Sequence, residues 1–479
     1  MINLALVLIL VVPVIGIVLL AVTPGYRIAA WLNVALSAAA FAGTCVLFTA
    51  PMQAGKFILL DSFNIYLLAL NSFIGFTTSI FSATYIAHEI AEKKLTRGYL
   101  RFYHALYQAM MTAMSLALLS NNLGLMWVGV EVATLSTVVM VGIYRTPEAI
   151  EAAWKYFILG SVGIALAFFG TILLYLAAQE VLGEGMIALT WSHLQTQSFN
   201  FDPALLSLAF VFLLAGYGTK VGLAPLHAWL PDAHAEGPTP ISAVLSGLLL
   251  NVALYAVLRI KMIMVGNIHA LPPGPIMMFM GLSSLFFASV MLYNRKDIKR
   301  LFAYSSIEHM GIITFAFGMG GPLANFAGLL HMTMHSLTKS GIFFAVGQIA
   351  QAKGTKKMSD ITGLARSNPR LAWGLGLGVI AIAGVPPFGV FTSEFLVVTT
   401  TFARKPYLAA ILSLGIILAF GALLMHLQKM LFGEPQGPSN KVTASRIPIF
   451  IHLGLVLLAG LWLPQILVDW FQRVAELLG

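Results

Sequence analysis

The chain has 479 residues, of which 59% are hydrophobic and only 9% are charged. Because a soluble protein is usually about one quarter charged, this composition excludes a chain made of soluble domains. The net charge of +9 could suggest a nucleic-acid-binding protein. We attribute it instead to the Lys and Arg residues that membrane proteins collect in their cytoplasmic loops, and we expect no nucleic-acid partner.

Apolar stretches recur from the first residues to the last. A stretch of about 20 such residues crosses the hydrocarbon core of a bilayer as an α-helix, whereas the strands of a membrane β-barrel alternate in segments of about 10 residues. The sequence therefore predicts an all-α polytopic protein with about 14 transmembrane helices, forming a single membrane domain. The predicted helices begin near Ile2, Tyr26, Ser62, Phe102, Leu123, Glu151, Pro203, Thr239, Gly274, Arg300, Leu323, Leu371, Pro406 and Arg446.

The positive charges of the loops predict the orientation. Most of the 27 Lys and Arg residues lie in odd-numbered loops, counted from the loop after the first helix. Because cytoplasmic loops are enriched in these residues, we expect the odd-numbered loops in the cytoplasm. Both termini would then lie on the outer side of a bacterial-type inner membrane. The segment Ile2 to Val22 lacks a basic start and a clear cleavage site, so we predict a span rather than a secretory signal.

Cysteine use limits the cofactors of the chain. Cys45 is the only cysteine, so an internal disulfide and a cysteine-ligated iron–sulfur or zinc site are excluded. We expect no redox cofactor, no catalytic site and no metal in this chain.

Several ionisable residues fall inside predicted spans. Glu131 lies in the middle of the fifth helix, Lys220 lies in the seventh before Pro225, and Glu394 lies in the twelfth. A charge at the bilayer centre costs at least about 2.5–3.5 kcal/mol, so such residues are candidates for function. The alternative for each is an ion pair that only holds two helices together.

The eleventh predicted helix carries three ionisable residues on one face. His331, His335 and Lys339 follow one another at intervals of one helical turn. Glu308 and His309 form a further pair near the start of the tenth helix. Two histidines at this spacing also suit haem or a metal ion, but the sequence shows no third ligand and Lys339 shares their face.

Together these side chains have the chemistry of a proton relay. Imidazole binds and releases a proton near neutral pH, and burial favours the neutral forms of lysine and of carboxylic acids. A nearby opposite charge reverses that preference, so the movement of one partner loads or unloads a proton. We therefore expect proton transfer along the series, and no binding of an organic substrate.

Proline interrupts two of the predicted helices, at Pro225 in GLAPLHAWLPDAHAEGPTP and at Pro386 in GVPPFG. Because proline lacks the amide donor and clashes with the preceding turn, each helix should split. By the predicted orientation, these two helices cross the membrane in opposite directions. Paired breaks of this kind are typical of inverted repeats. We expect two half-channels, helices 4–8 over residues 102–266 and helices 9–13 over residues 274–432.

These motifs resemble those of the antiporter-like subunits of respiratory complex I, of the multi-subunit Na+/H+ antiporters and of the membrane-bound [NiFe] hydrogenases. The resemblance covers helices 3 to 13 and is strongest in KVGLAPLHAWLPDAHAEGPTPISAVLSG. The segments RKDIKRLFAYSSIEHMG, HSLTKSGIFFAVG and GVPPFGVFTSEF follow in the family's order. Two further stretches, EVATLSTVVMVGIYR and HMTMHSLTKSGIFFAVGQIAQAKGTKKMSDITGL, are most similar to the hydrogenase-4 component F type.

The resemblance implies a role for individual positions. Glu131 is similar to the family's fifth-helix glutamate, Lys220 to the lysine at the break, and Lys339 to the central lysine of the eleventh helix. Glu394 is similar to the terminal residue of the relay, and His309 to a frequent histidine of the tenth helix.

The link between the two half-channels departs from the family. Many relatives have Lys or His where this chain has Asn251, so we expect water to complete the relay there, or the relay to be interrupted. His227, Asp232 and His234 are candidates for a cytoplasmic entrance, with Lys155 as a further linker candidate, and the alternative is that they are ordinary loop residues.

The leading hypothesis is a proton-translocating subunit of an energy-converting respiratory complex of the membrane-bound hydrogenase type. The resemblance implies [NiFe] and iron–sulfur centres in partner subunits, which comprise a peripheral cytoplasmic redox arm and other membrane subunits. The alternatives are a Na+/H+ antiporter subunit, a proton-pumping subunit of complex I, and a scaffold whose charges only join helices.

Overall fold

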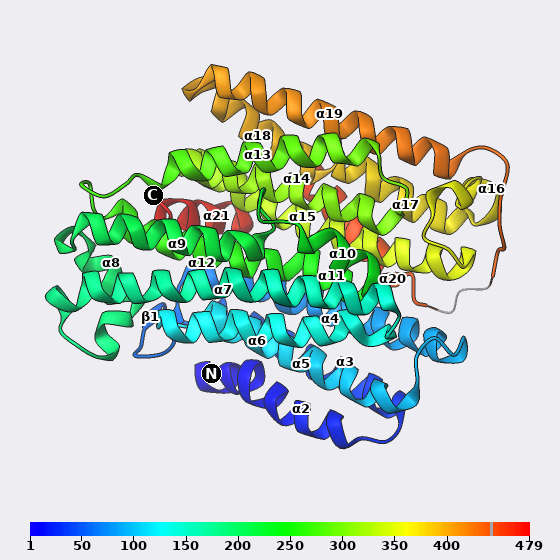
Figure 1. Ribbon diagram of the computed structural model, residues 1–479, viewed down its shortest axis with the longest axis horizontal. Coiled ribbons are helices and arrows are strands. Elements are labelled where there is room, and N and C mark those ends of the chain that lie inside the picture. Colours follow the sequence, from blue (N-terminus) through cyan, green and yellow to red (C-terminus); the bar gives the residue numbers. More distant parts are fainter. Residues whose placement is uncertain (441–443) are drawn as a thin grey trace.

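The computed structural model describes residues 1–440 and 444–479, with the side chains of all of these except residues 97–99 and 101. Long helices run side by side along one axis (Figure 1), and the described strands are one short antiparallel pair, β1 (Gln53–Ala54) and β2 (Leu59–Leu60). The predicted all-α polytopic architecture is confirmed.

The first half of the chain forms twelve α-helices and several short π or 3-10 segments. In chain order they are α1 (Ile2–Leu6), η1 (Val7–Val11), α2 (Val12–Val22), α3 (Tyr26–Leu47), α4 (Ser62–Ala91), α5 (Arg97–Leu119), α6 (Leu123–Val141), η2 (Gly142–Tyr144), α7 (Pro147–Leu182), η3 (Met186–Leu189), α8 (Trp191–Gln197), η4 (Ser198–Asn200), α9 (Pro203–Val221), α10 (Trp229–Glu236), α11 (Thr239–Val244), η5 (Leu245–Leu249) and α12 (Leu250–Val265).

The second half continues in the same manner. Its elements are α13 (Pro273–Tyr293), α14 (Ile298–Met319), α15 (Pro322–Lys353), η6 (Met358–Asp360), α16 (Leu364–Ser367), α17 (Pro369–Ile382), α18 (Gly389–Arg404), α19 (Pro406–Leu431), α20 (Ile447–Leu461) and α21 (Gln465–Leu477).

Local sequence explains where the helices begin. Side chains of Asp61, Asn122, Asp202 and Asp297 accept hydrogen bonds from the free amides at the starts of α4, α6, α9 and α14, as N-cap residues do. The helices α5 and α7 begin earlier than the predicted Phe102 and Glu151, because they continue through polar residues beyond their apolar segments.

Within the described residues, nine helices are long and apolar enough to cross a membrane, and the bent pair α20–α21 would make a tenth. The helices α14 and α15 are not in this set because of their many polar residues, although nearly all their side chains are buried. The number of fourteen spans stays a prediction.

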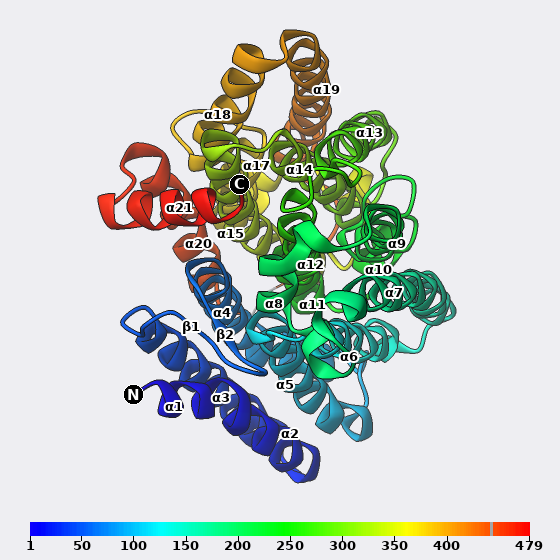
Figure 2. The ribbon, with the colours of Figure 1, turned by 90° about the vertical axis from the view of Figure 1, so that its left-hand side faces the viewer.

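The interior of the molecule consists of α11, α12, α14 and α15. The span Thr239–Val265 is wholly buried, and the end-on view in Figure 2 shows the other helices surrounding this group. Polar side chains in a helix are tolerated where they face other protein rather than lipid. The ionisable residues of α14 and α15 therefore lie in the most protected part of the fold.

Both predicted helix breaks are present. The helix α9 ends at Val221, Gly222 takes a left-handed conformation with φ of 81°, and α10 starts at Trp229. The helix α17 ends at Ile382 and α18 starts at Gly389. Backbone groups freed by the first break find partners, since Ala224 N donates to Ser284 Oγ at 2.8 Å.

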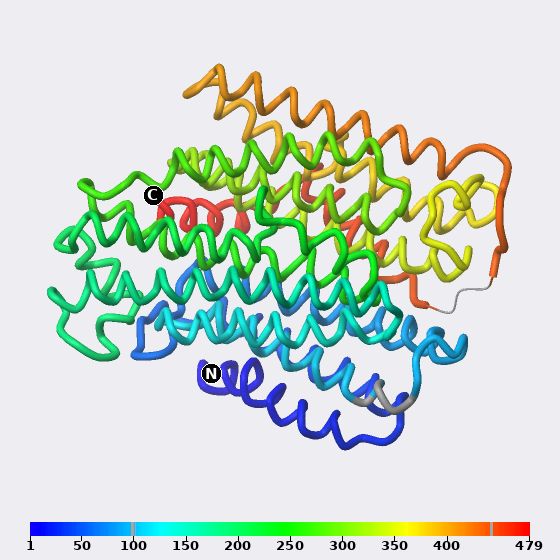
Figure 3. The backbone as a smooth tube through the Cα atoms, viewed as in Figure 1, coloured from blue at the N-terminus to red at the C-terminus, as the bar shows by residue number. Residues whose placement is uncertain are grey.

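The two ends of the molecule differ in charge. The exposed lysines Lys93, Lys94, Lys296 and Lys357 gather at one end, which we call the lysine-rich face. It is the end at which α16 lies, whereas α8, β1 and both termini lie toward the other end (Figure 1), and the helices in the backbone trace of Figure 3 run between the two.

The last predicted span is divided. The helices α20 and α21 meet at an angle of 83°, because Trp462 is extended and Pro464 precedes the new helix. The helix α21 turns back against the molecule, where the side-chain amide of Asn325 donates to Ala475 O at 3.1 Å and to Gly479 O at 2.8 Å.

Candidate functional site

Lys220 and Glu131 form a pair inside the helix bundle. Lys220 lies near the end of α9 and is fully buried, and its Nζ is 3.7 Å from Glu131 Oε2 on α6. The same Nζ donates a hydrogen bond to Thr134 Oγ1 at 3.0 Å. A Cβ at Gly160 of α7 would lie 2.8 Å from this Nζ, so the glycine leaves the space that the ammonium occupies.

The break after α9 closes the site around Lys220. Trp229, the first residue of α10, stacks on Tyr156 with ring centroids 4.3 Å apart and donates to Thr219 O at 2.8 Å. Tyr156 in turn lies 5.9 Å from the Lys220 ammonium. The interrupted helix therefore places an aromatic wall beside the buried lysine, whereas Glu131 stays partly exposed.

A second group of buried side chains comes from α14, α15 and α18. His309 Nδ1 and His331 Nε2 are hydrogen-bonded at 3.1 Å, and His331 Nδ1 and Ser393 Oγ at 2.8 Å. Glu394 Oε1 lies 3.8 Å from His309 Nδ1, and Glu308 Oε2 lies 3.7 Å from His309 Nε2. The structure thus brings together three residues that the sequence analysis selected on different helices.

His335 and Lys339 extend this group along α15. The ring of His335 is 5.5 Å from that of His309, and neither of its nitrogens has a hydrogen-bond partner among the described residues. The Lys339 ammonium is fully buried, donates to Phe302 O at 3.0 Å and interacts electrostatically with Glu308. We call these residues the histidine cluster: Glu308, His309, His331, His335, Lys339 and Glu394.

The histidine cluster contains a possible ligand set for a cation. One ligand atom each of His309, His331 and Glu394 lies within 4.8 Å of the others. The sequence pointed to His331 and His335 as the pair that would suit haem or a metal ion. The structure instead groups His331 with His309 and Glu394. Two of these nitrogens already share a hydrogen bond, so ion binding would require that bond to open.

Asp232 and Lys155 lie outside both groups. Asp232 accepts from Lys155 at 3.2 Å and pairs with Arg300 at 2.6 Å, and Lys155 also pairs with Glu151 at 2.6 Å. These residues form an ion-pair network that joins α7, α10 and α14 near the lysine-rich face.

The other entrance candidates are buried. His227 lies in the break after α9 with its ring centroid 4.3 Å from that of Phe287. His234 is fully buried on α10, stacks on Phe343 at 5.0 Å and has no partner for either nitrogen among the described residues. Phe343 lies one turn beyond Lys339 on α15, so His234, but not Asp232, packs against the helix that carries the histidine cluster.

Asn251 contacts only one of the two groups. Its Nδ2 donates to Gly247 O at 3.0 Å and to Ser336 Oγ at 2.6 Å, next to His335 in sequence. Its Oδ1 is buried without a partner among the described residues. Among the described residues, no hydrogen bond or ion pair joins Lys220 to the histidine cluster, so the link between the groups stays a prediction.

Sequence reasoning missed several buried ionisable residues, among them Arg259, Glu89 and Lys299. Arg259 pairs with Asp61 at 2.7 Å near the end opposite the lysine-rich face. Glu89 and Lys299 are each 3% exposed and line a pocket on the lysine-rich face. All three lie near the ends of predicted spans, where hydropathy assigns charged residues to loops. Only Glu89 could have been recognised as buried from the sequence, because its neighbours in YIAHEIA are mostly apolar.

Comparisons with known proteins identify the family of the chain. The sequence profile of the NADH:quinone oxidoreductase/Mrp antiporter transmembrane family matches residues 120–419. The chain is 58% identical over 466 residues to a hydrogenase-4 component F homolog of Methylacidiphilum infernorum, covering 97% of this chain and 98% of that protein. It is 27% identical over 349 residues to NADH-quinone oxidoreductase subunit N of Desulforudis audaxviator, covering 72% and 67% respectively.

The fold is also shared with a solved structure. A chain of the membrane-bound sulfane sulfur reductase, an archaeal respiratory membrane complex, superposes with a TM-score of 0.87 at 21% identity. The superposition covers 99% of this chain and 97% of that chain.

Proposed function

The chain belongs to the NADH:quinone oxidoreductase/Mrp antiporter transmembrane family, and we propose from this premise that it translocates protons within a complex of the hydrogenase-4 type. It is an antiporter-like subunit of an energy-converting membrane complex. Its relatives are subunits of complexes with other membrane subunits, so the chain works beside such partners.

One observation carries the proposal. The histidine cluster is a row of buried titratable groups in which His309 and His331 are hydrogen-bonded at 3.1 Å, and His331 is also hydrogen-bonded to Ser393 at 2.8 Å. Burying ionisable groups in a membrane protein costs free energy, so such a row indicates a function. Proton transfer along it requires no organic ligand. Imidazoles in hydrogen-bonded contact can pass a proton from one ring to the next.

The Lys220–Glu131 pair supplies a second proton-binding step. Lys220 Nζ and Glu131 Oε2 are 3.7 Å apart, so the two charged groups attract each other without a short hydrogen bond. A carboxylate nearby favours the charged lysine, and its withdrawal favours release of the proton. We propose that this pair serves the half-channel of residues 102–266 and that Lys339, His335, His331, His309 and Glu394 serve the half-channel of residues 274–432.

The proposal extends to topology and partners. The lysine-rich face is proposed to be cytoplasmic and both termini to lie outside the inner membrane, because positive loops remain in the cytoplasm. The [NiFe] and iron–sulfur centres are proposed to lie in a peripheral arm made of other subunits. Asn251 is proposed to hold a water between the half-channels through its Oδ1, which has no hydrogen-bond partner among the described residues.

Replacement of Lys339 tests the relay. We expect the Lys339→Ala complex, purified and reconstituted into proteoliposomes, to assemble but to lose proton translocation per electron transferred by at least about tenfold, because a buried proton carrier is removed. Lys296→Ala is the control, since that lysine is exposed on the lysine-rich face. A Lys339→Ala complex that pumps normally would support the scaffold, and activity that requires sodium would support the antiporter alternative.

Mass spectrometry of the complex that co-purifies in mild detergent tests the complex type. We expect a nickel–iron large subunit and iron–sulfur proteins. Flavin- and NADH-binding subunits would instead identify a complex of the respiratory complex I type, and small membrane subunits alone would favour the Na+/H+ antiporter.

A further inference from the structure

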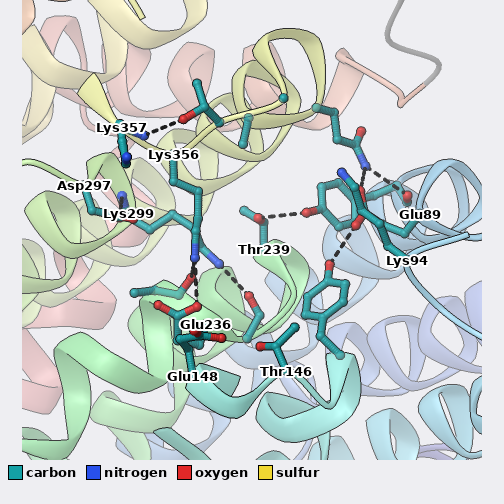
Figure 4. Close-up of a pocket in the computed structure, with 18 residues that line it drawn as sticks. Glu89, Lys94, Thr146, Glu148, Glu236, Thr239, Asp297, Lys299, Lys356 and Lys357 are labelled. Carbon is teal, nitrogen blue, oxygen red and sulfur yellow. Dashed lines mark hydrogen bonds and ion pairs between the residues drawn. The ribbon is translucent and has the colours of Figure 1, made fainter. Parts of the chain in front are cut away.

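A pocket of about 570 Å³ opens on the lysine-rich face. Figure 4 shows its wall, which is made by the ends of α4, α7, α10, α14 and α15 and by the loop after α15. The pocket, which we call the vestibule, therefore lies where the two proposed half-channels meet. Its rim is held by Lys356, which donates to Glu236 at 2.9 Å and to Ala235 O at 3.0 Å.

Glu89 differs from the other acids of the vestibule. It is 3% exposed, and its two carboxylate oxygens accept from Tyr144 Oη at 3.1 Å and from Gln351 Nε2 at 2.7 Å. Both donors are neutral, and no ion pair of Glu89 is found among the described residues, whereas Glu236 is paired with Lys356. A buried carboxylate whose side-chain hydrogen-bond donors are both neutral, beside a polar pocket, can accept a proton without first breaking a salt bridge.

Lys299 is a second buried ionisable residue in the wall of the vestibule. It is 3% exposed, its Nζ donates to Gly237 O at 2.5 Å, and it interacts electrostatically with Glu89. The carbonyl of Gly237 belongs to the turn between α10 and α11, so this lysine lies against the second part of the broken helix.

His234 lies on α10 near both Lys299 and the helix that carries the histidine cluster. It is fully buried, and its ring stacks on that of Phe343, one turn beyond Lys339 on α15, with centroids 5.0 Å apart. Gly237, whose carbonyl accepts from Lys299, follows it three residues later in the chain. Both ring nitrogens of His234 lack a hydrogen-bond partner among the described residues. An imidazole with two uncommitted nitrogens is suited to receive a proton on one and to release it from the other.

We propose that the vestibule is the proton entrance of the second half-channel and that Glu89 is the first proton acceptor, followed by Lys299 and His234 on the way to Lys339. Glu89 takes one proton from water in the vestibule and returns to the carboxylate when Lys299 or an intervening water takes that proton. Each group gains and loses one proton per passage, so nothing is consumed. This inference rests on the proposed proton translocation.

The conservative variant Glu89→Gln tests the role of the carboxylate. We expect the reconstituted complex to assemble and to lose proton translocation per electron by at least about tenfold, because the amide cannot carry the proton. Glu92→Gln is the matched control, since Glu92 is exposed at the end of the same helix. Tyr144→Phe removes one hydrogen bond but keeps the carboxylate, so it should retain most of the transport.

Two outcomes would overturn the inference. If Glu89→Gln pumps as the unchanged complex does, Glu89 is not on the path. If Tyr144→Phe fails to the same degree as Glu89→Gln, the glutamate has a structural role. Failure of Lys339→Ala with normal transport in Glu89→Gln rejects only the entrance, whereas normal transport in both variants rejects the proposed function itself.

Accessibility provides a measurement that does not depend on transport. Cys45 is the only cysteine, so a Cys45→Ser background carrying Glu89→Cys has a single thiol in this chain. We expect a membrane-impermeant thiol reagent to label it from the lysine-rich face and not from the opposite face, as detected by peptide mass spectrometry of the complex. Labelling from the opposite face only, or from neither, contradicts a vestibule that reaches Glu89.

Discussion

At the residue scale, buried charges in this chain fall into two kinds. Arg259 pairs with Asp61 at 2.7 Å and lies over the rings of Trp191 and Tyr255 at 4.4 Å and 4.8 Å. Such tight enclosure fixes the arginine, and arginine stays charged at any physiological pH. Lys339 instead has one backbone carbonyl as hydrogen-bond acceptor. A lysine, unlike an arginine, can release its proton when buried, so only the second kind of site suits the proposed relay.

Gly160 offers a test of how closely Lys220 must be placed. A Cβ at this position would lie 2.8 Å from Lys220 Nζ, so Gly160→Ala should push the ammonium away from Thr134 and Glu131. Because only the end of a flexible side chain has to move, we expect normal assembly and a severalfold loss of proton translocation. Proton flux per electron in proteoliposomes measures the effect.

The matched control for this variant is Gly454→Ala. Nothing lies within 4 Å of a Cβ built at Gly454, so the same added methyl group should leave transport unchanged. Equal transport in both variants would contradict a requirement for the observed position of Lys220.

At the scale of elements, two devices shape the helices. Breaks at Pro225 and Pro386 divide two spans, and small residues let neighbouring spans approach closely. The helices α13 and α14 meet at Gly281 and Gly311, where a Cβ on either glycine would lie 2.6 Å from the carbonyl oxygen of the other. Close contact of this kind replaces the hydrophobic effect, which does not drive helix association in lipid.

The contact between α13 and α14 predicts a loss of stability in Gly281→Ala. The nearest atoms are backbone atoms of α14, which cannot move away as a side chain can, so the helices must separate. Overpacking of this kind costs about 1–3 kcal/mol. We expect a lower thermal unfolding midpoint of the purified complex in detergent, and Gly454→Ala again provides the control. An unchanged midpoint would show that the two helices separate at little cost.

At the scale of the whole molecule, charge separates the two ends. The lysine-rich face carries the vestibule, and the opposite end carries both termini, where α21 is held by hydrogen bonds such as that from Lys261 Nζ to Leu478 O at 3.2 Å. A bilayer would surround the helices between these ends, and positive loops would keep the lysine-rich face in the cytoplasm.

Single cysteines at the two ends test this orientation. In the Cys45→Ser background, we expect Lys93→Cys to react with an impermeant thiol reagent only in inverted membrane vesicles, and Lys56→Cys only in right-side-out vesicles. Both lysines are exposed, so access to the thiol depends on the membrane side alone. The reverse pattern would place the vestibule outside and invert the proposed direction of entry.

Much of the molecule follows from the sequence alone. The membrane class follows from 9% charged residues, and the breaks follow from prolines within apolar segments. The ionisable residues in the middle of apolar segments, such as Lys220 and Lys339, were also predicted, because each stands out against its own neighbours in the chain. These properties depend on local composition, which hydropathy and helical periodicity describe directly.

Only the tertiary structure decided which of these residues meet. It joins Lys220 to Glu131 and sets His309 against His331 and Glu394. It also moves Asp232 into an ion-pair network and buries Glu89 under a vestibule. Hydropathy shows that a helix spans the membrane but not which face it turns toward which neighbour. That choice is made by close packing between helices far apart in the chain, and the proposed proton path depends on it.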